Sequence, residues 1–436
     1  MSVFSGRAAA FCAAIFVLLV CAGAAPAIAK DDERISTREK GKITAATAIL
    51  IEDNYHDAEK AEMIADALRK AGDAQVFAKA ETKVQYAAAL TGFLHPHDGH
   101  FAVMWTNGEE TPDHHDADWD RVARRTNFGF EKVEILSGNV GYIKMTSFEA
   151  PKISAKTAAS AMGMVANADA LILDLTNNGG GEPETVQLML SYLFDGAPRQ
   201  VGAIYWRKND QLQQYWTLPV VPGERYLDRP LYVLGGAGTA SAAEMFMVQI
   251  RNHKRGDLIG QRTYGAGNAG EVFKPSNEFE IFIANGGPVR AQDIYDKEGV
   301  APDLETASGE ELSRALLLAW EAILKSAKDP LQINAINWAQ ARLSAEIDPL
   351  PLSDDDMQGL AGDFGDRQIV IRDGRLVYER GRRAPEFLVA AGDDVFFLQN
   401  LPGIKIELVR NKNKDVTQMT MTWQDGHKEE FPRSTP

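Results

Sequence analysis

The sequence predicts an α/β core, preceded by an N-terminal helical domain and followed by a C-terminal antiparallel β domain. Three observations support this fold class. Between residues 140 and 303, apolar strands, glycine-rich turns and helix-like stretches alternate, as in a largely parallel sheet. Before this region, apolar residues recur every three or four positions, and after residue 352 they alternate in short runs. The chain of 436 residues is long enough for two or three domains.

Residues 1–29 have the pattern of a secretory signal peptide. Arg7 is followed by an apolar run over residues 11–20 and by an A-x-A cleavage site at 27–29. The run is too short for a membrane anchor, so we expect an exported chain, periplasmic or extracellular, with no membrane span after cleavage. Cleavage would also remove Cys12 and Cys21, the only cysteines. The mature protein would then have no disulfide, no thiol nucleophile and no thiolate metal site. The formal net charge of −15 argues against nucleic acid as a partner.

Residues 30–105 are predicted to form the helical domain. Ala61, Ile64 and Leu68 fall on one helical face, and Gly72 follows as a stop signal. The α/β core is expected at 133–330. It contains predicted strands at 140–145, 170–175, 232–234 and 258–260, helices at 184–194 and 241–252, and a hairpin at 201–217.

Residues 331–356 are predicted to be a linker, because their end is rich in proline and aspartate. The β domain is expected at 357–436. Apolar and polar residues alternate at 369–371, 376–378, 404–408 and 419–423, and Asp373-Gly374 is a hairpin-turn pair. This pattern is typical of a sandwich or a barrel.

Ser241 follows an apolar strand and a run of small residues, and a helix-like stretch begins directly after it. A serine at such a turn exposes its hydroxyl beside the positive end of a helix, where a developing oxyanion is stabilised. That position suits a nucleophile. Serine is also a common helix N-cap, so a purely structural role is the alternative.

A second glycine-rich turn lies at residues 177–181 and includes Gly179 and Gly180. Consecutive glycines after a buried strand allow backbone amides to face a ligand closely, which suits an oxyanion hole. A plain tight turn is the alternative. A phosphate-binding loop is not indicated, because no G-x-x-x-x-G-K-[ST] pattern is present.

Asp98-Gly99-His100 provides a candidate base. The pKa of histidine lies near neutrality, so His100 is suited to take a proton from a serine hydroxyl. His95, His97 and His100 with Asp98 also have spacings that permit a metal site, and a structural loop histidine is a third interpretation. No metal-ligand motif supports the second. We therefore expect no metal and no cofactor.

The chain from about residue 38 to residue 303 resembles the C-terminal-processing (tail-specific) serine peptidase family. Its closer likeness is to the branch that contains the interphotoreceptor retinoid-binding protein and the tricorn protease core. Asp98-Gly99-His100 is similar to the D-x-H loop, 141–148 to the G-Y-I…F strand and 173–181 to D-L-R-x-N-x-G-G. Residues 239–244 with 259–267 are similar to the nucleophile segment and its loop, and 299–303 to G-V-x-P-D.

The resemblance implies a crotonase-like (ClpP/crotonase) αβ core and Ser241 as the nucleophile. Tail-specific members carry a lysine base where this chain has Ala266, so the resemblance points to His100 as the base instead. It implies an oxyanion hole formed by the amides of Gly180 or Gly179 and Ala242. Residues 106–132 are too short and too polar for the PDZ domain of the tail-specific members, and Thr176 replaces the arginine of D-L-R.

The acid of the site has two candidates. In the related branch a glutamate lies three residues before G-V-x-P-D, where this chain has Asp296, and Glu298 competes with it. The expected function is therefore a secreted or periplasmic serine-type peptidase that acts on peptides or proteins. The alternatives are a non-catalytic ligand-binding protein on the same fold, and an esterase or amidase.

Overall fold

The computed structural model describes residues 33–106, 117–348 and 350–434, and the predicted signal peptide therefore lies outside the described residues. The chain divides into two compact units, one of residues up to 135 with 140–315, and one of 136–139 with the residues from 316 onward. None of the described helices has the length and apolar character that a membrane crossing requires.

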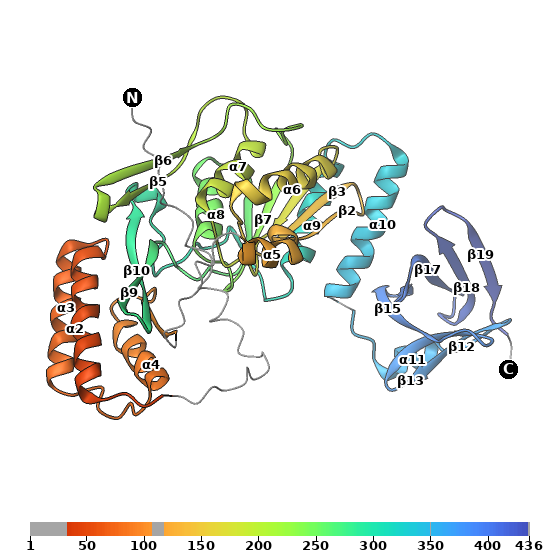
Figure 1. Ribbon diagram of the computed structural model, residues 1–436. Coiled ribbons are helices and arrows are strands. Elements are labelled where there is room, and N and C mark those ends of the chain that lie inside the picture. The colour runs from red at the N-terminus through yellow and green to blue at the C-terminus, as the bar shows by residue number, and fades with distance from the viewer. Residues whose placement is uncertain (1–32, 107–116, 349, 435–436) are drawn as a thin grey trace. The chain divides into compact units, whose positions relative to one another are not determined.

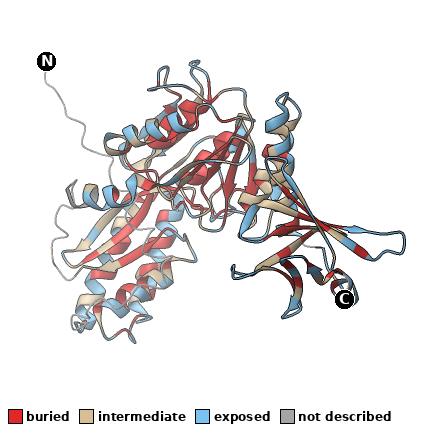
Figure 2. Cartoon of the chain, turned by 90° about the vertical axis from the view of Figure 1, so that its right-hand side faces the viewer, coloured by how far each residue is buried: buried red, intermediate tan, exposed pale blue. Residues whose placement is uncertain are grey.

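The first unit contains a mixed α/β core around a six-stranded sheet in the order β11-β8-β7-β4-β3-β2 (Figure 1). The strands β3, β4, β7, β8 and β11 pair in parallel. Every residue of β4 and of β7 is buried, as expected for strands covered on both faces, and buried residues gather on these strands (Figure 2). The strands of this sheet are β2 (Phe130–Leu136), β3 (Val140–Met145), β4 (Ala170–Asp174), β7 (Leu231–Gly235), β8 (Asp257–Gly260) and β11 (Leu304–Glu305).

Three helices share the apolar core of this sheet, and each follows a strand. Residues of all three belong to one buried cluster with Ile143, Leu173 and Val233 of the strands. Because β4 and β7 each lead through a short turn into a helix, the carboxyl ends of these neighbouring strands bring two turns to one edge of the sheet. The helices are α6 (Pro151–Met164), α7 (Pro183–Leu193) and α8 (Ala242–Asn252).

The N-terminal helices do not form a domain of their own. They pack against a second sheet of the same unit, in which Phe279, Ile281 and Ile283 of β10 share one buried cluster with the helices (Figure 1). Alternation at these three positions directs the apolar face of β10 toward the helices. This part comprises α2 (Thr37–Asn54), α3 (Ala58–Asp73), α4 (Lys83–Leu94), β1 (Ala102–Trp105), β9 (Ala269–Ser276), β10 (Phe279–Pro288) and the hairpin β5 (Gln200–Trp206)–β6 (Gln211–Trp216), which the sequence predicted.

The linker expected at 331–356 is instead largely helical. Helix α10 (Pro330–Ile347) has Asp329 as its N-cap, whose side chain accepts a hydrogen bond from the amide of Leu331. Proline occupies the first position of the helix. The aspartates at 354–356 form the first turn of α11 (Asp354–Leu360), capped by Ser353. Acidic side chains are favourable at a helix N-terminus, so the feature that suggested a linker is a helix-start signal. Helix α9 (Glu311–Leu324) precedes both.

The second unit contains the predicted antiparallel β sheet, with eight strands paired in chain order. Helix α10 belongs to this unit, and the indole of Trp338 donates to the carbonyl of Pro402. The amide of Ser434 donates to the carbonyl of Asp363, so the end of the chain meets the first strand. The strands are β12 (Gly362–Phe364), β13 (Arg367–Arg372), β14 (Arg375–Arg380), β15 (Glu386–Gly392), β16 (Val395–Leu398), β17 (Leu401–Arg410), β18 (Val416–Trp423) and β19 (Lys428–Pro432).

Candidate active site

Ser241 lies at the turn between β7 and α8 in a backbone conformation that is rare for serine. Its φ is 54° and its ψ is −121°. A residue other than glycine in this region is strained, and such strain persists only where surrounding contacts hold it. Here the amide of Ser241 donates to the Glu244 carboxylate at 2.9 Å, and the hydroxyl of Tyr295 donates to the carbonyl of Ser241 at 3.1 Å. The turn that the sequence predicted is therefore held on both sides.

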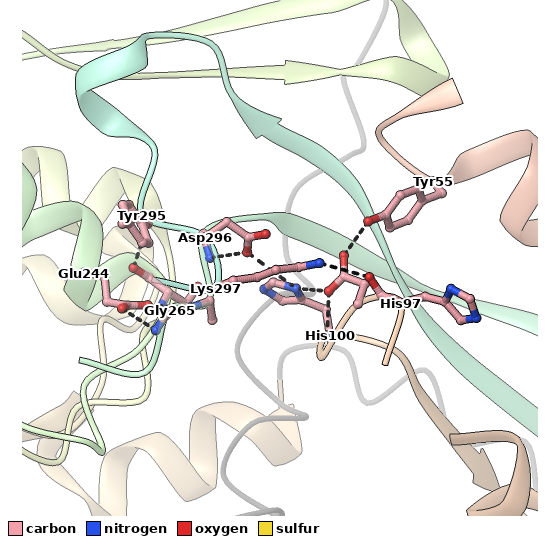
Figure 3. Close-up of polar contacts among 12 residues, drawn as sticks. Tyr55, His97, His100, Glu244, Gly265, Tyr295, Asp296 and Lys297 are labelled. Carbon is pink, nitrogen blue, oxygen red and sulfur yellow. Dashed lines mark hydrogen bonds and ion pairs between the residues drawn. The ribbon is translucent and has the colours of Figure 1, made fainter. Parts of the chain in front are cut away.

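Glu244 connects this turn to the loop at 263–267. Its carboxylate is fully buried and also accepts hydrogen bonds from the hydroxyl of Thr263 and the amides of Gly265 and Ala266 (Figure 3). Burial raises the pKa of Glu244, and the four donors act in the opposite direction by stabilising the charged form. Ala266, at the position of the family's lysine, thus contributes its amide to this network.

The glycine turn of 177–181 packs directly against Ser241. A β-carbon placed on Gly180 would lie 2.7 Å from Cβ of Ser241 and 3.1 Å from the amide nitrogen of Ala242. The amide of Gly180 already donates to Oδ1 of the buried Asn178, at 2.9 Å. Within the described residues, the amides of Gly179 and Ala242 have no acceptor. Both amides are therefore free to bind an oxyanion.

His100 and Asp98 form a buried pair in the loop between α4 and β1. Nδ1 of His100 lies 2.5 Å from Oδ1 of Asp98, which also accepts the amide of His100 at 2.9 Å. The second oxygen of Asp98 accepts the hydroxyl of Tyr55 at 2.7 Å (Figure 3). Nε2 of His100 is buried without a hydrogen-bond partner among the described residues. An Nδ1–H bonded to Asp98 leaves Nε2 unprotonated, which is the form a general base needs.

The pKa values of this pair follow from burial and mutual contact. Burial alone would lower the pKa of His100, but the hydrogen bond and charge of Asp98 outweigh it and raise the pKa above 6.5. Burial would raise the pKa of Asp98, but its bonds from His100 and Tyr55 outweigh that and lower the pKa. Asp98 is therefore charged near neutral pH.

Of the two predicted acids, Asp296 lies near His100 and Glu298 does not. Oδ1 of Asp296 is 4.0 Å from Nδ1 of His100 and accepts the amide of Gly267 at 3.1 Å (Figure 3). The side chain of Glu298 is exposed, because the chain turns after Lys297, whose φ is 66°. Tyr295, which contacts the Ser241 carbonyl, directly precedes Asp296. Two adjacent residues, Tyr295 and Asp296, therefore reach the Ser241 turn and the His100 loop respectively.

The alternative of a histidine metal site finds no support in the described residues, where no group of three or more potential ligands could hold an ion. The imidazole of His97 points away from that of His100 (Figure 3), and its carbonyl accepts Nζ of Lys297 at 3.1 Å. Sequence reasoning did not anticipate the contacts of Tyr55 and Glu244 at this site. The sequence indicated Asp98 only as part of the D-x-H loop or as a possible metal ligand, although its two-residue spacing to His100 also fits an orienting carboxylate.

The comparison with known families then places the central segment. The model of peptidase family S41 matches residues 139–306. These residues form a peptidase S41 domain. The S41 domain contains Ser241, the glycine turn and Asp296, whereas Asp98, His100 and Tyr55 precede it.

Two proteins with similar sequences illustrate the extent of the match. The carboxyl-terminal-processing protease of Synechocystis is 31% identical over 169 residues, covering 38% of this chain and 37% of that protein. The tail-specific protease of Haemophilus influenzae is 34% identical over 160 residues, covering 34% of this chain and 20% of that protein. The chain thus matches less than two-fifths of the length of either relative. A solved structure, the photosystem II D1 C-terminal processing protease, aligns at 14% identity with a TM-score of 0.41, covering 61% of this chain and 93% of that chain.

Proposed function

We propose that this protein is an exported serine peptidase with a crotonase-like core, which hydrolyses peptide bonds with Ser241 as nucleophile and His100 as base. The observation that carries the proposal is the link, through the neighbouring residues Tyr295 and Asp296, between a strained serine turn with two unbonded amides and a histidine held by Asp98. The similarity to carboxyl-terminal-processing and tail-specific proteases supports peptide or protein substrates. The pattern of residues 1–29 supports export.

In the first step, Nε2 of His100 takes the proton of the Ser241 hydroxyl while Oγ attacks the scissile carbonyl. Nε2 suits this role because it has no partner in the part of the chain that the structure describes and because Nδ1 is engaged by Asp98. The imidazolium that forms has two carboxylates near its Nδ1, Asp98 at 2.5 Å and Asp296 at 4.0 Å, and both stabilise its charge.

The negative charge on the substrate oxygen is then held by backbone amides. Gly179 and Ala242 are the preferred donors, because the amide of Gly180 is bonded to Asn178. Gly180 instead allows the close approach of the two turns, since any larger residue would meet Ser241. The imidazolium returns its proton to the leaving amine, and water hydrolyses the acyl-enzyme by the same base.

In this proposal Asp98 orients His100, and Asp296 acts through space from 4.0 Å. Glu298 has no part, because its side chain is exposed.

Labelling of the mature protein with a fluorophosphonate probe, combined with peptide hydrolysis, tests the proposal. We expect labelling and turnover in the unmodified protein, and loss of both in Ser241→Ala and His100→Ala with an unchanged thermal unfolding midpoint. Peptide hydrolysis that survives Ser241→Ala would contradict it. Silence of the unmodified protein toward the probe would favour a ligand-binding role, and faster cleavage of esters than of peptides would favour an esterase.

A further inference from the structure

The hydroxyl of Tyr55 makes a buried contact with the site from the end of helix α2. Only 2% of Tyr55 is exposed, and its hydroxyl donates to Oδ2 of Asp98 at 2.7 Å. Its ring stacks on Phe101 with 5.4 Å between ring centroids, and its carbonyl accepts a guanidinium hydrogen bond from Arg207 at 2.8 Å. The direction of the hydroxyl is therefore fixed by the surrounding fold (Figure 3).

The orientation of the Asp98 carboxylate depends on the Tyr55 hydroxyl, because Asp98 is shielded from water that could otherwise bind it. It is 1% exposed, and one of its oxygens accepts both hydrogen bonds from His100. Tyr55 donates to the other oxygen. Without that donor, this oxygen would be buried and unpaired, and the carboxylate would gain by rotating away from its present orientation.

We propose that Tyr55 is a positioning residue of the proposed peptidase, holding the Asp98 carboxylate so that one oxygen faces Nδ1 of His100 and Nε2 stays ready to accept a proton. This inference rests on the proposed function. It extends the active unit beyond the S41 domain, because Tyr55 lies at the end of a helix that precedes the matched residues.

Removal of the Tyr55 hydroxyl should change the pKa of His100 in a predictable direction. Tyr55 and His100 both donate hydrogen bonds to the Asp98 carboxylate and reduce its negative charge. Loss of the Tyr55 donor therefore strengthens the interaction of Asp98 with the imidazolium of His100. The pKa of His100 should therefore rise in Tyr55→Phe. The other charged groups nearby are unchanged by the substitution: Asp296 and Glu244 act on His100, His56 is coupled to Asp98, and Asp57 acts on Tyr55 and His56. Lys297 donates to the carbonyl of His97.

Tyr86→Phe is the matched control. Tyr86 is also fully buried in the N-terminal helical part, and its hydroxyl is bonded to Thr44 and to the carbonyl of Lys40. Both substitutions remove one buried hydroxyl and keep the ring. Only the first removes a donor to Asp98, so a general loss of stability should affect the two variants alike.

The experiment measures the pKa of His100 by NMR of ¹⁵N-histidine-labelled protein in the Ser241→Ala background, with His100→Gln to assign the signal. We expect a rise of about one pH unit in Tyr55→Phe and no change in Tyr86→Phe, since one hydrogen bond to a charged group corresponds to roughly that shift. In the active background, the acidic limb of kcat/KM should move to higher pH by the same amount. Equal pKa values of His100 in both variants would overturn the inference.

A second variant keeps the test decisive if Tyr55→Phe does not fold. Incorporation of 3,5-difluorotyrosine at position 55 keeps the ring and makes the hydroxyl a stronger donor, so the pKa of His100 should fall. Burial and the charge of Asp98 raise the pKa of Tyr55, which favours the protonated hydroxyl. A rise or no change would count against Tyr55. If no variant hydrolyses any peptide, the proposed function fails, and the NMR comparison still decides the role of Tyr55.

Discussion

Replacement of Asp98 by asparagine should lower kcat about 10⁴-fold, a loss of about 5.5 kcal/mol of transition-state stabilisation. The reason is the 2.5 Å contact between Asp98 and Nδ1 of His100. An asparagine amide turned toward Nδ1 donates a hydrogen bond instead of accepting one, which places the imidazole proton on Nε2. In that tautomer His100 cannot accept the proton of Ser241.

Asp296→Asn provides the comparison. Two unit charges 4 Å apart interact with about 1 kcal/mol in water and about 4 kcal/mol near a protein surface. Asp296 is 4.0 Å from Nδ1 of His100 and its side chain is 18% exposed, and asparagine keeps the oxygen that accepts the Gly267 amide. We therefore expect a loss near the lower figure, about fivefold in kcat.

The assay is steady-state peptide hydrolysis by both variants, with thermal unfolding to verify folding and NMR to read the His100 tautomer. Asp98→Asn should show the proton on Nε2, and Asp296→Asn should not. The assignment is refuted if Asp98→Asn retains more than about a tenth of the activity while Asp296→Asn loses about 10³-fold or more. In that case Asp296 is the orienting acid.

Further predictions concern the Ser241 turn and the dependence of activity on pH. Gly180→Ala should destabilise the fold by about 1–3 kcal/mol and reduce probe labelling about 100-fold, because the φ of Gly180 is 109° and the new methyl group would meet Ser241. In the control Gly179→Ala, the new methyl group has no neighbouring atom within 4 Å, so the unfolding free energy and the probe labelling should equal those of the unmodified protein. Glu244→Gln should cost about 2–4 kcal/mol in chemical unfolding because an amide cannot accept four donors, whereas exposed Glu298→Gln should stay within about 0.5 kcal/mol; equal effects would contradict the network. Activity should rise as the pH increases through the pKa of His100, which is raised above 6.5, because only the neutral imidazole can act as base. The protonated imidazole contributes stability that is fully present below pH 6.5 and is lost as the pH rises through the raised pKa. A pH–rate profile that is flat from pH 6 to 9 would contradict His100 as the base.

Features carried by contiguous residues could be predicted from the sequence. The buried strands β4 and β7, the turns after them and the hairpin at 201–217 all follow from local patterns of apolar residues and glycine. The sequence did not predict the helix at 330–347, because proline and aspartate are typical both of a linker and of a helix start. The burial of Ile336 and the contact of Trp338 with Pro402 stabilise the helix, and neither can be seen in the local sequence. The N-terminal helices were predicted to form a separate domain, but they pack against strand β10, which lies about 200 residues later in the chain, and no local pattern indicates that contact.

The sequence by itself determined the class of fold and the candidate chemistry, because the Ser241 turn and the glycine turn each follow an apolar strand pattern that is local in the chain. Only the tertiary structure decided which groups contact His100. Asp98 rather than Glu298 faces its ring, Asp296 stands at a distance, and Tyr55 reaches Asp98 from a separate helix. The contact of Tyr55 with Asp98 joins residues 43 positions apart, and that of Asp296 with His100 joins residues about 200 positions apart. Their distances depend on how helices and sheets pack, which no local pattern encodes.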